Sequence, residues 1–385
     1  MLNFDYYNPT RIVFGKDSIA RLDELVPADA RVLILCGGGS AERNGTLAEV
    51  EAALGSRTVQ RFGGIEPNPA YETLMGAVEQ IRREKLDFLL AVGGGSVIDG
   101  TKFVAAAVHY ADEPWTILET GGKHLTQALP MGCVLTLPAT GSEMNCLAVV
   151  TRKSLQAKLS FASPLVFPRF SVLDPVRTFT LPPRQIANGA VDAFVHVVEQ
   201  YLTYPVNAPV QDRYAESLMQ TLIEVGPQAL ATPEDYDVRA NLMWTATQAL
   251  NGLIGAGVPQ DWATHLIGHE LTVLYGLDHA QTLAIVLPRL LHLRRDAKRA
   301  KLLQFAARVW NLHTGTEDER IDAAIARTRA FFESLGVKTA LSDYGIGTEA
   351  VERIVTQLEA HGMTQLGEHR DINLATSRRI LEACL

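Results

Sequence analysis

The stretch FLLAVGGGSVIDGTK, residues 88–102, joins an apolar run to a helical pattern through three glycines and a serine. The run at 88–92 is continuously apolar, which is typical of strands buried on both faces of a parallel sheet. Glycines at such a strand end let the main chain approach a phosphate, and the following helix start offers N–H groups and a positive dipole end. Ser96 is expected to cap this helix and to add a donor. Gly94, Gly95 and Ser96 are therefore candidates for binding a phosphate.

The same alternation of strand and helix continues on both sides of this stretch. Further strand-like runs lie at 31–36, 132–137 and 170–174, and helical patterns lie at 41–54, 70–85 and 97–111. This order predicts an α/β domain with a doubly wound, Rossmann-like sheet. Prolines break the pattern at 175–183, and from Ile186 onward only helical periodicity is present. We expect a nucleotide-binding α/β domain over residues 1–180 and an all-α domain over residues 181–385.

A second glycine loop, GGGS at 37–40, follows the run at 31–36 and carries no acidic side chain. An acid at this place would bind a ribose 2′-hydroxyl and repel a 2′-phosphate. The uncharged loop, with Arg43 one turn further on, predicts a preference for NADP(H) over NAD(H). Neither glycine loop has the G-x-G-x-x-G pattern, and a tight turn without a ligand is the alternative for each. Two such loops at strand ends make that alternative less favoured.

A third polar element, TLPATGSE at 136–143, follows another expected strand. Thr136, Thr140 and Ser142 could line a cofactor or substrate cleft. A turn rich in Ser and Thr that ends in a helix cap explains the same residues, and the two interpretations stay open.

Composition and charge exclude several classes of protein. The 385 residues include 35 Lys and Arg against 43 Asp and Glu, a formal net charge of −8 with no basic run, so nucleic acid is not the expected partner. No apolar stretch approaches the roughly 18 residues of a membrane span, and the N-terminus lacks the pattern of a signal peptide. The four scattered cysteines form no CxxC pair, which favours a reducing cytoplasm.

Histidines and an aspartate recur at helical spacing in the second half. His265 and His269 lie four residues apart, as do Asp192 and His196, and His279 follows a short Gly-Leu-Asp link. Two helices that each present such a pair could close a site for Fe(II) or Zn(II). Singly, each group is more often a hydrogen-bonded polar side chain than a ligand. Burying the Asp192 pair without a strong partner would nevertheless cost roughly 2–5 kcal/mol. The HExxH, GxSxG and GxxxxGK[ST] motifs are absent.

With these motifs, the chain resembles the iron-containing (group III) alcohol dehydrogenase family along essentially its whole length. Within the family, the likeness is to the bacterial NADPH-dependent aldehyde reductases and butanol dehydrogenases. The resemblance implies a dehydroquinate-synthase-like fold, with a nucleotide-binding α/β domain and a helical metal-binding domain, and a homodimer. It is carried by GGIEPNP (63–69), GGGSVIDGTK (93–102), LTLPATGSE (135–143), the Asp192/His196 helix and GVPQDWATHLIGHELT…GLDHAQ (257–281).

The resemblance also implies roles for individual residues. Four metal ligands are implied, namely Asp192, His196, His265 and His279. His269 matches a histidine that does not ligate the metal and lies near the proton path, and Asp99 matches a position near the nicotinamide. The implied cofactor contacts are Gly38, Ser40, Gly94, Gly95, Ser96, Asp99, Thr136, Thr140 and Lys158, with Gly38 and Ser40 beside the 2′-phosphate. The segment 144–147 departs from some relatives and would bear on substrate size.

The implied activity is reversible hydride transfer between nicotinamide C4 and short- to medium-chain aldehydes or alcohols, with NADP(H), one divalent metal, and His269 and Asp99 as catalytic residues. A dehydroquinate-synthase-like or glycerol-dehydrogenase-like enzyme on the same fold is one alternative, and a non-catalytic nucleotide sensor is another. The synthase-like lyase would need a basic, phosphate-binding pocket near the metal. The stretch 250–285 around the ligands contains no Lys or Arg, which counts against it.

Overall fold

The computed structural model describes residues 1–385, and the chain divides into two compact units. Unit 2 contains Tyr7–Leu181 and Pro233–Thr247, and unit 1 contains Met1–Tyr6, Pro182–Thr232 and Gln248–Leu385. The chain passes from unit 2 to unit 1 between Leu181 and Pro182, beside the boundary expected near residue 180. The sequence did not indicate that Met1–Tyr6 belongs to unit 1 or that Pro233–Thr247 belongs to unit 2. The division into domains at 1–180 and 181–385 stays a prediction. No helix combines the length and apolar character needed to cross a membrane.

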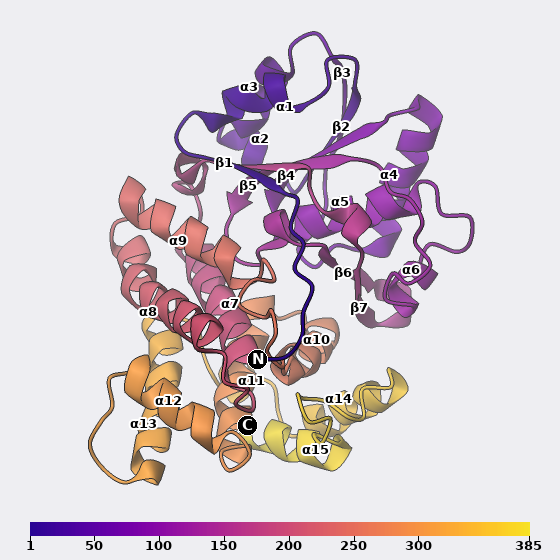
Figure 1. Cartoon of the computed structure of the whole chain (residues 1–385). Coiled ribbons are helices and arrows are strands. Elements are labelled where there is room, and N and C mark those ends of the chain that lie inside the picture. Colours follow the sequence, from indigo (N-terminus) through magenta and orange to yellow (C-terminus); the bar gives the residue numbers. More distant parts are fainter. The chain divides into compact units, whose positions relative to one another are not determined.

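Unit 2 is built on a six-stranded sheet in which all neighbouring strands are parallel, in the order β1-β8-β5-β4-β2-β3 (Figure 1). The four strands expected from apolar runs are confirmed, and β1, β3 and an antiparallel β6-β7 pair add to them. The strands are β1 (Arg11–Phe14), β2 (Arg31–Cys36), β3 (Thr58–Phe62), β4 (Phe88–Gly94), β5 (Met131–Leu137), β6 (Leu147–Arg152), β7 (Ala157–Ala162) and β8 (Phe170–Leu173).

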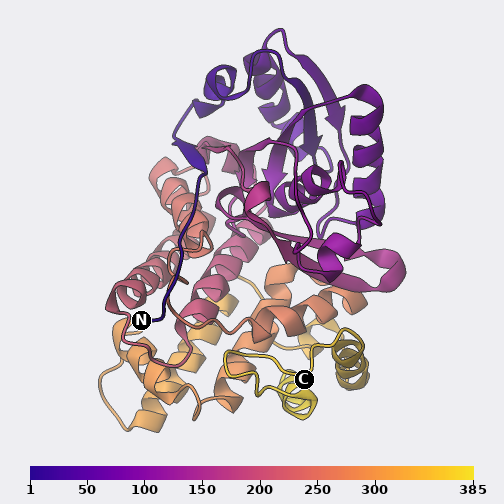
Figure 2. The same ribbon diagram turned by 45° about the vertical axis from the view of Figure 1, so that its right-hand side comes forward.

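Helices cover both faces of this sheet (Figure 2), and successive strand residues pack into opposite cores. Ile34 and Val92 pack with α1, α2 and α3, while Leu35 and Ala91 pack with α4 and α5. This two-sided burial explains the continuously apolar strands. The helical elements of unit 2 are η1 (Ser18–Arg21), α1 (Leu22–Leu25), α2 (Ser40–Arg43), α3 (Thr46–Leu54), α4 (Tyr71–Glu84), α5 (Gly95–Ala107), α6 (Thr116–Glu119), η2 (Ser142–Met144), η3 (Lys153–Leu155), η4 (Pro164–Val166), η5 (Pro175–Thr178) and most of α9 (Tyr236–Ala249).

The order of the strands places the glycine loops at a functional edge. The helices that follow β2 cover one face and those that follow β3 and β4 cover the other, so the winding reverses between β2 and β4. Open α/β sheets bind ligands at the carboxyl ends of strands at such a switch point. The loops after β2, β4 and β5, three neighbouring strands, are the three polar elements found in the sequence.

Unit 1 is helical, and no strand follows β8, which confirms the all-α second half. Helix α7 packs against α8 and α11, and α10 packs against α11 and α14 (Figure 1). Every α7 side chain from Gly189 to Tyr201 is buried, so polar groups on this segment must find partners inside the unit. The helical elements are α7 (Pro183–Tyr201), α8 (Pro209–Ala231), α10 (Ala263–Tyr275), α11 (His279–Leu293), α12 (Arg299–Arg308), α13 (Glu317–Ser334), η6 (Ser342–Tyr344), α14 (Glu349–Ala360) and α15 (Leu374–Ala383).

Candidate metal centre and cofactor loops

Helix α7 carries two of the expected metal ligands, Asp192 and His196, one turn apart. Their exposed fractions are only 3% and 4%. Oδ1 of Asp192 lies 3.6 Å from Nδ1 of His196 and 3.7 Å from Nε2 of His279. One carboxylate oxygen therefore lies within reach of two imidazoles from different helices.

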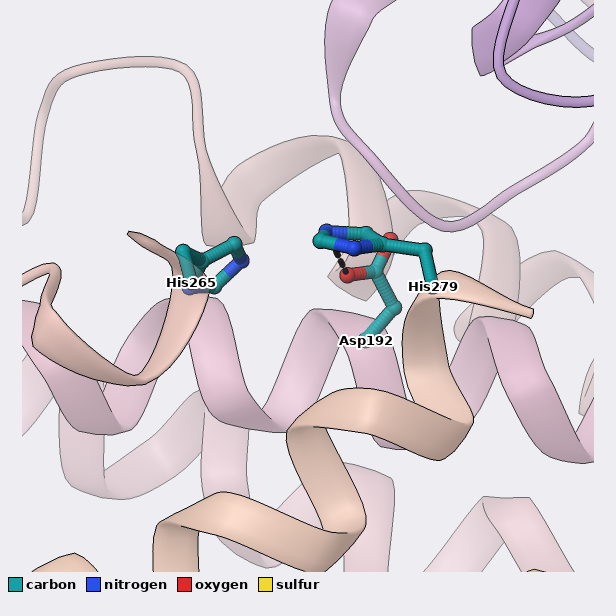
Figure 3. Close-up of side chains that lie close together, drawn as sticks. All are labelled: Asp192, His265 and His279. Carbon is teal, nitrogen blue, oxygen red and sulfur yellow. Dashed lines mark ion pairs between the residues drawn. The ribbon is translucent and has the colours of Figure 1, made fainter. Parts of the chain in front are cut away.

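The other two expected ligands come from α10 and α11. Asp192, His265 and His279 each offer a ligand atom, and these atoms all lie within 4.8 Å of one another. Figure 3 shows the His265 ring with a nitrogen facing the pair formed by Asp192 and His279. The ring of His196 stacks on that of His265 with centroids 4.6 Å apart. The structure thus brings all four side chains together, three in a close group and His196 against two members of it.

The start of α11 is tied to α7 immediately before His279. Asp278 and Gln281 form a capping box at this helix start. Nδ2 of Asn188, on α7 one turn before Asp192, donates to Oδ2 of Asp278 at 2.8 Å. The local sequence therefore fixes where His279 leaves the loop relative to Asp192.

The sequence interpretation missed Glu199, which lies on the same face of α7 as Asp192 and His196. Its Oε1 accepts a hydrogen bond from the Thr264 N–H at 2.7 Å, and its Oε2 contacts Nδ1 of His265. Burial raises the pKa of the Glu199 carboxyl well above its usual range and Asp261 adds to the rise, while bonds from Thr264 and the Lys298 cation lower it. The signal available in the sequence was the i, i+4, i+7 spacing of the three residues.

The donor set fits a divalent metal ion. Three imidazoles and one carboxylate suit Fe(II) or Zn(II), and the ligating form of histidine is the neutral one. Burial lowers the pKa of His196 to about 4, with His265 lowering it further and Asp192 opposing the shift. His196 is therefore neutral at ordinary pH and ready to ligate.

His269, the expected proton-path residue, lies one turn after His265 on α10 and is buried. Its ring centroid is 5.5 Å from that of His279, and it is outside the close group of three. This position beside the cluster suits a group that exchanges protons there, and the role itself stays a prediction.

In unit 2, the glycine loop after β4 leads into α5, and the N-cap residue of this helix is not the expected one. Helix α5 begins at Gly95, Gly94 is the N-cap residue, and no side chain caps the helix, so the role of cap predicted for Ser96 was wrong. Ser96 lies in the first turn, and its Oγ accepts a hydrogen bond from the Asn68 N–H at 3.2 Å. The loop offers a phosphate the main-chain N–H groups of the helix start, and Ser96 keeps its own hydroxyl proton as a further donor because its Oγ only accepts from Asn68.

Close packing explains why glycines occupy this helix start. A Cβ on Gly95 would lie 2.4 Å from Oγ1 of Thr140, and one on Gly94 would lie 2.9 Å from Cβ of Leu137. The loop after β4 thus packs directly on the loop after β5, which brings Gly94, Gly95 and Thr140 together. Thr136, also expected at the cofactor, lies within β5 and is buried.

Asp99 lies on α5 and is held by the protein through both carboxylate oxygens. Its Oδ1 accepts from Oγ of Ser142 at 2.6 Å, and its Oδ2 accepts from the Val149 N–H at 3.0 Å. Burial raises the pKa of the Asp99 carboxyl, and the cation of Lys102 is the largest opposing influence. These contacts tie α5 to the segment after β5, while a catalytic role for Asp99 stays a prediction.

Lys158, expected from the resemblance, lies on β7 and is 5% exposed. Its Nζ donates to Oδ1 of Asn68 at 2.8 Å, so Lys158, Asn68 and Ser96 form one chain of contacts. Asn68 was missed, although an Asn within GGIEPNP is typical of the left-handed conformation that it adopts, with φ of 55°. It is a further candidate for arranging the phosphate loop.

Gly38 and Ser40, expected beside a 2′-phosphate, lie in the loop after β2. A Cβ on Gly38 would meet nothing within 4 Å, and Ser40 begins α2 after Gly39, whose φ is 98°. The space beside this loop is therefore open, and Nη1 of Arg43 lies only 3.1 Å from a Cβ built on Gly39.

Residues 9–175 match the family described as iron-containing alcohol dehydrogenase, and residues 186–384 match the C-terminal part of the same family. The chain belongs to the iron-containing alcohol dehydrogenase family. A member from Escherichia coli K12, NADPH-dependent aldehyde reductase YqhD, is 65% identical over the whole of both chains. The crystal structure of E. coli K-12 YqhD superposes with a TM-score of 0.99 at 64% identity and covers 100% of this chain and 99% of that one.

The family includes members with different dinucleotides. The probable NADH-dependent butanol dehydrogenase 1 of Bacillus subtilis is 41% identical over the full length of both chains. Membership of the iron-containing alcohol dehydrogenases therefore does not by itself decide between NADH and NADPH, and the local residues of the loop after β2 become decisive.

Proposed function

We propose that this chain is a metal-dependent, NADP(H)-dependent alcohol dehydrogenase that acts as an aldehyde reductase on short- to medium-chain substrates. The observation that carries the proposal is the convergence of ligand atoms from Asp192, His265 and His279 within 4.8 Å. The 65% identity to an NADPH-dependent aldehyde reductase supports the same activity.

The choice of NADP(H) rests on the loop after β2. Gly37 to Ser40 carry no acidic group that would repel a 2′-phosphate, and the position of Gly38 is sterically open. Arg43 adds a cation beside the loop. The ratio of kcat/KM for NADPH to that for NADH tests this assignment: we expect a ratio well above one, and a strong preference for NADH would contradict it.

The protein's own residues prepare the site for carbonyl reduction. Asp192, His196, His265 and His279 would hold the divalent ion, which when bound supplies Lewis acidity toward the carbonyl oxygen. NADPH, when bound, would supply the hydride. The main-chain N–H groups after β4 would bind its pyrophosphate. His269, buried one turn from His265, would donate the proton that the product oxygen requires, since an imidazole ring can both hold and release a proton.

Oxidation of NADPH by a short aldehyde, followed at 340 nm, tests the reductase against its rivals. We expect one NADPH consumed for each aldehyde reduced, and no turnover by protein stripped of metal. A lyase that uses the dinucleotide as a temporary oxidant would show no net consumption, and neither would a nucleotide sensor. Failure to oxidise NADPH after reloading with Fe(II) and with Zn(II) would refute the proposal.

Two further parts of the proposal concern the cellular location and the oligomeric state of the enzyme. A cytoplasmic location agrees with four cysteines that are all thiols. A homodimer is carried over from the family resemblance. Light scattering coupled to size exclusion should therefore give twice the 42.0 kDa mass of the chain, and a mass of one chain would contradict it.

A further inference from the structure

Glu199, on α7, contacts both the candidate metal ligand His265 and the first turn of α10, the helix that carries His265. It is 2% exposed, and its two oxygens contact two successive residues of α10, Oε1 the Thr264 N–H and Oε2 the His265 ring. Helix α10 lacks a side-chain cap from its N-cap residue, Trp262, whose φ is 65°. The carboxylate of Glu199, delivered from α7, therefore supplies a contact that α10 does not make for itself.

The contact with His265 determines which ring nitrogen is available to a metal. Nδ1 is engaged by Glu199, which leaves Nε2 as the nitrogen for the cluster, and Figure 3 shows a ring nitrogen facing Asp192 and His279. With Glu199 Oε2 as the acceptor of an Nδ1–H bond, Nε2 of His265 carries the lone pair that a metal needs. In the opposite tautomer, Nε2 would carry the proton and could not ligate.

We propose that Glu199 is a positioning residue for the metal: it fixes the tautomer and the ring orientation of His265 while it anchors the start of α10. This inference rests on the metal site of the proposed function. Glu199 is buried with the Asp261 and Lys298 side chains, and Nζ of Lys298 lies 2.7 Å from Oδ2 of Asp261 and 2.7 Å from Oε1 of Glu368. The Glu199 carboxyl group itself is held by its contacts with the Thr264 N–H and the His265 ring.

Substitution by glutamine separates positioning from simple space filling. Glu199→Gln keeps the shape but leaves one acceptor for two donors, Thr264 N–H and His265 Nδ1–H. If the amide oxygen keeps Thr264, the amide NH2 faces Nδ1 and selects the tautomer protonated at Nε2. If it keeps His265, the NH2 opposes the Thr264 N–H. Either arrangement weakens the metal site without opening a cavity.

Asp261→Asn is the matched control. Oδ1 of Asp261 accepts from the Ala263 N–H at 3.0 Å and its Oδ2 pairs with Nζ of Lys298, so Asp261 also anchors the start of α10, through groups that are not candidate metal ligands. The change again replaces an acid by its amide in the same buried cluster. A role confined to helix capping would make the two variants alike.

The experiment measures Zn²⁺ binding by metal-stripped full-length protein and the visible spectrum of the Co²⁺-loaded protein. We expect Glu199→Gln to raise the Zn²⁺ dissociation constant about 10–100-fold and to shift the Co²⁺ bands, the size of effect typical of lost outer-shell partners. Asp261→Asn should stay within about twofold of wild type in both. Thermal unfolding of the metal-free proteins reports the capping contribution of each residue separately.

Unchanged Zn²⁺ affinity and Co²⁺ spectrum in Glu199→Gln would overturn the inference, as would equal weakening by Asp261→Asn. If Glu199→Gln does not fold, Glu199→Asp, which keeps the acid and withdraws it by one methylene, must weaken Zn²⁺ binding more than Asp261→Asn does. Wild-type protein that binds neither ion would refute the metal-dependent function itself, which is a different result from a wild type that binds and a variant that binds equally well.

Discussion

The metal cluster of unit 1 and the glycine loops of unit 2 differ in which part of the residue carries the function. In the cluster, the candidate ligands are buried or half-buried polar side chains, and Asp192, His265 and His279 come from three helices. In the loops the main chain acts, and residues such as Gly95 are there because a side chain would collide with Thr140. Side-chain removal should therefore damage the first region, and side-chain addition should damage the second.

The largest effect is expected from His265→Ala. Removing one ligand from the close group should lower metal content to near zero and kcat by at least about 10³-fold, because carbonyl polarisation is lost with the ion. Elemental analysis and the 340 nm assay measure the two losses. NADPH binding, followed by nucleotide fluorescence, should change by less than about threefold. An equally large loss of NADPH affinity would show that the two regions are not separable.

His269→Ala tests a different function within the same unit. The residue lies beside His279 but outside the close group, so the variant should keep its metal while kcat falls by about 10²-fold, the range for one proton-transferring group. Metal analysis and steady-state kinetics together decide the matter. Loss of metal from this variant would contradict the assignment of His269 to proton transfer.

Gly95→Ala makes the opposite kind of change in unit 2. The added methyl would lie 2.4 Å from Oγ1 of Thr140, so the loop after β4 must shift away from the phosphate position. We expect NADPH affinity to fall about tenfold, roughly 1.4 kcal/mol, with unchanged Zn²⁺ binding. Gly76→Ala is the control, since its methyl would meet only the Phe62 ring, at an ordinary 3.5 Å. Equal effects of both alanines would remove the steric argument.

The parts of the fold that could be predicted are those in which the sequence pattern of a short segment already reflects how that segment is buried. β2, β4, β5 and β8 are buried on both faces, and their apolar runs revealed them. β3, with the sequence TVQRF, is exposed or half-exposed throughout, so it lacks such a run. The helix expected at 41–54 divides around Asn44 and Gly45, whose φ is 80°. Ser96 is not the cap because α5 already begins at Gly95, where Thr140 leaves no room for a Cβ, and no local pattern contains that contact.

The candidate metal site likewise has one part that local sequence patterns predict and another that depends on how the helices pack. The four-residue spacings of Asp192 with His196 and of His265 with His269 were visible in the sequence, because one helix turn is a local property. That His279 and not His269 joins the close group depends on how α11 packs on α7 and α10, and only the family resemblance anticipated it. Glu199 was overlooked because a glutamate on a helix is usually solvated, and its burial follows from the enclosure of α7 from Gly189 to Tyr201.

The smallest expected effect concerns the pH dependence of stability. Glu143, a buried acid of unit 2, and His196, a buried histidine of unit 1, should contribute to it with opposite signs. Glu143 is completely buried, and its Oε1 accepts from Oγ1 of Thr247 at 2.5 Å, while its Oε2 has no hydrogen-bond partner. Burial raises the pKa of its carboxyl above the ordinary 4.5, against the opposing Thr247 bond. An acid with a raised folded-state pKa contributes stability that is complete below the unfolded value and is lost as pH rises through the folded one. His196 has the opposite sign, since its lowered pKa makes the metal-free protein lose stability as pH falls from 6.5 toward about 4.

Glu143→Gln, neutral at every pH, should therefore lose less stability than wild type between pH 5 and pH 8. Metal-stripped protein is the right material, because proton-linked metal binding would otherwise dominate the profile. We expect the unfolding midpoint of the variant to rise relative to that of wild type by one or two degrees over this range, less than about 1 kcal/mol, the net size of one buried hydrogen bond. The contribution of His196 is common to both proteins and cancels in the difference. Parallel midpoints across the whole range would mean that Glu143 titrates as it does in the unfolded chain, and that burial in unit 2 is less complete in solution than the packing around Thr247 indicates.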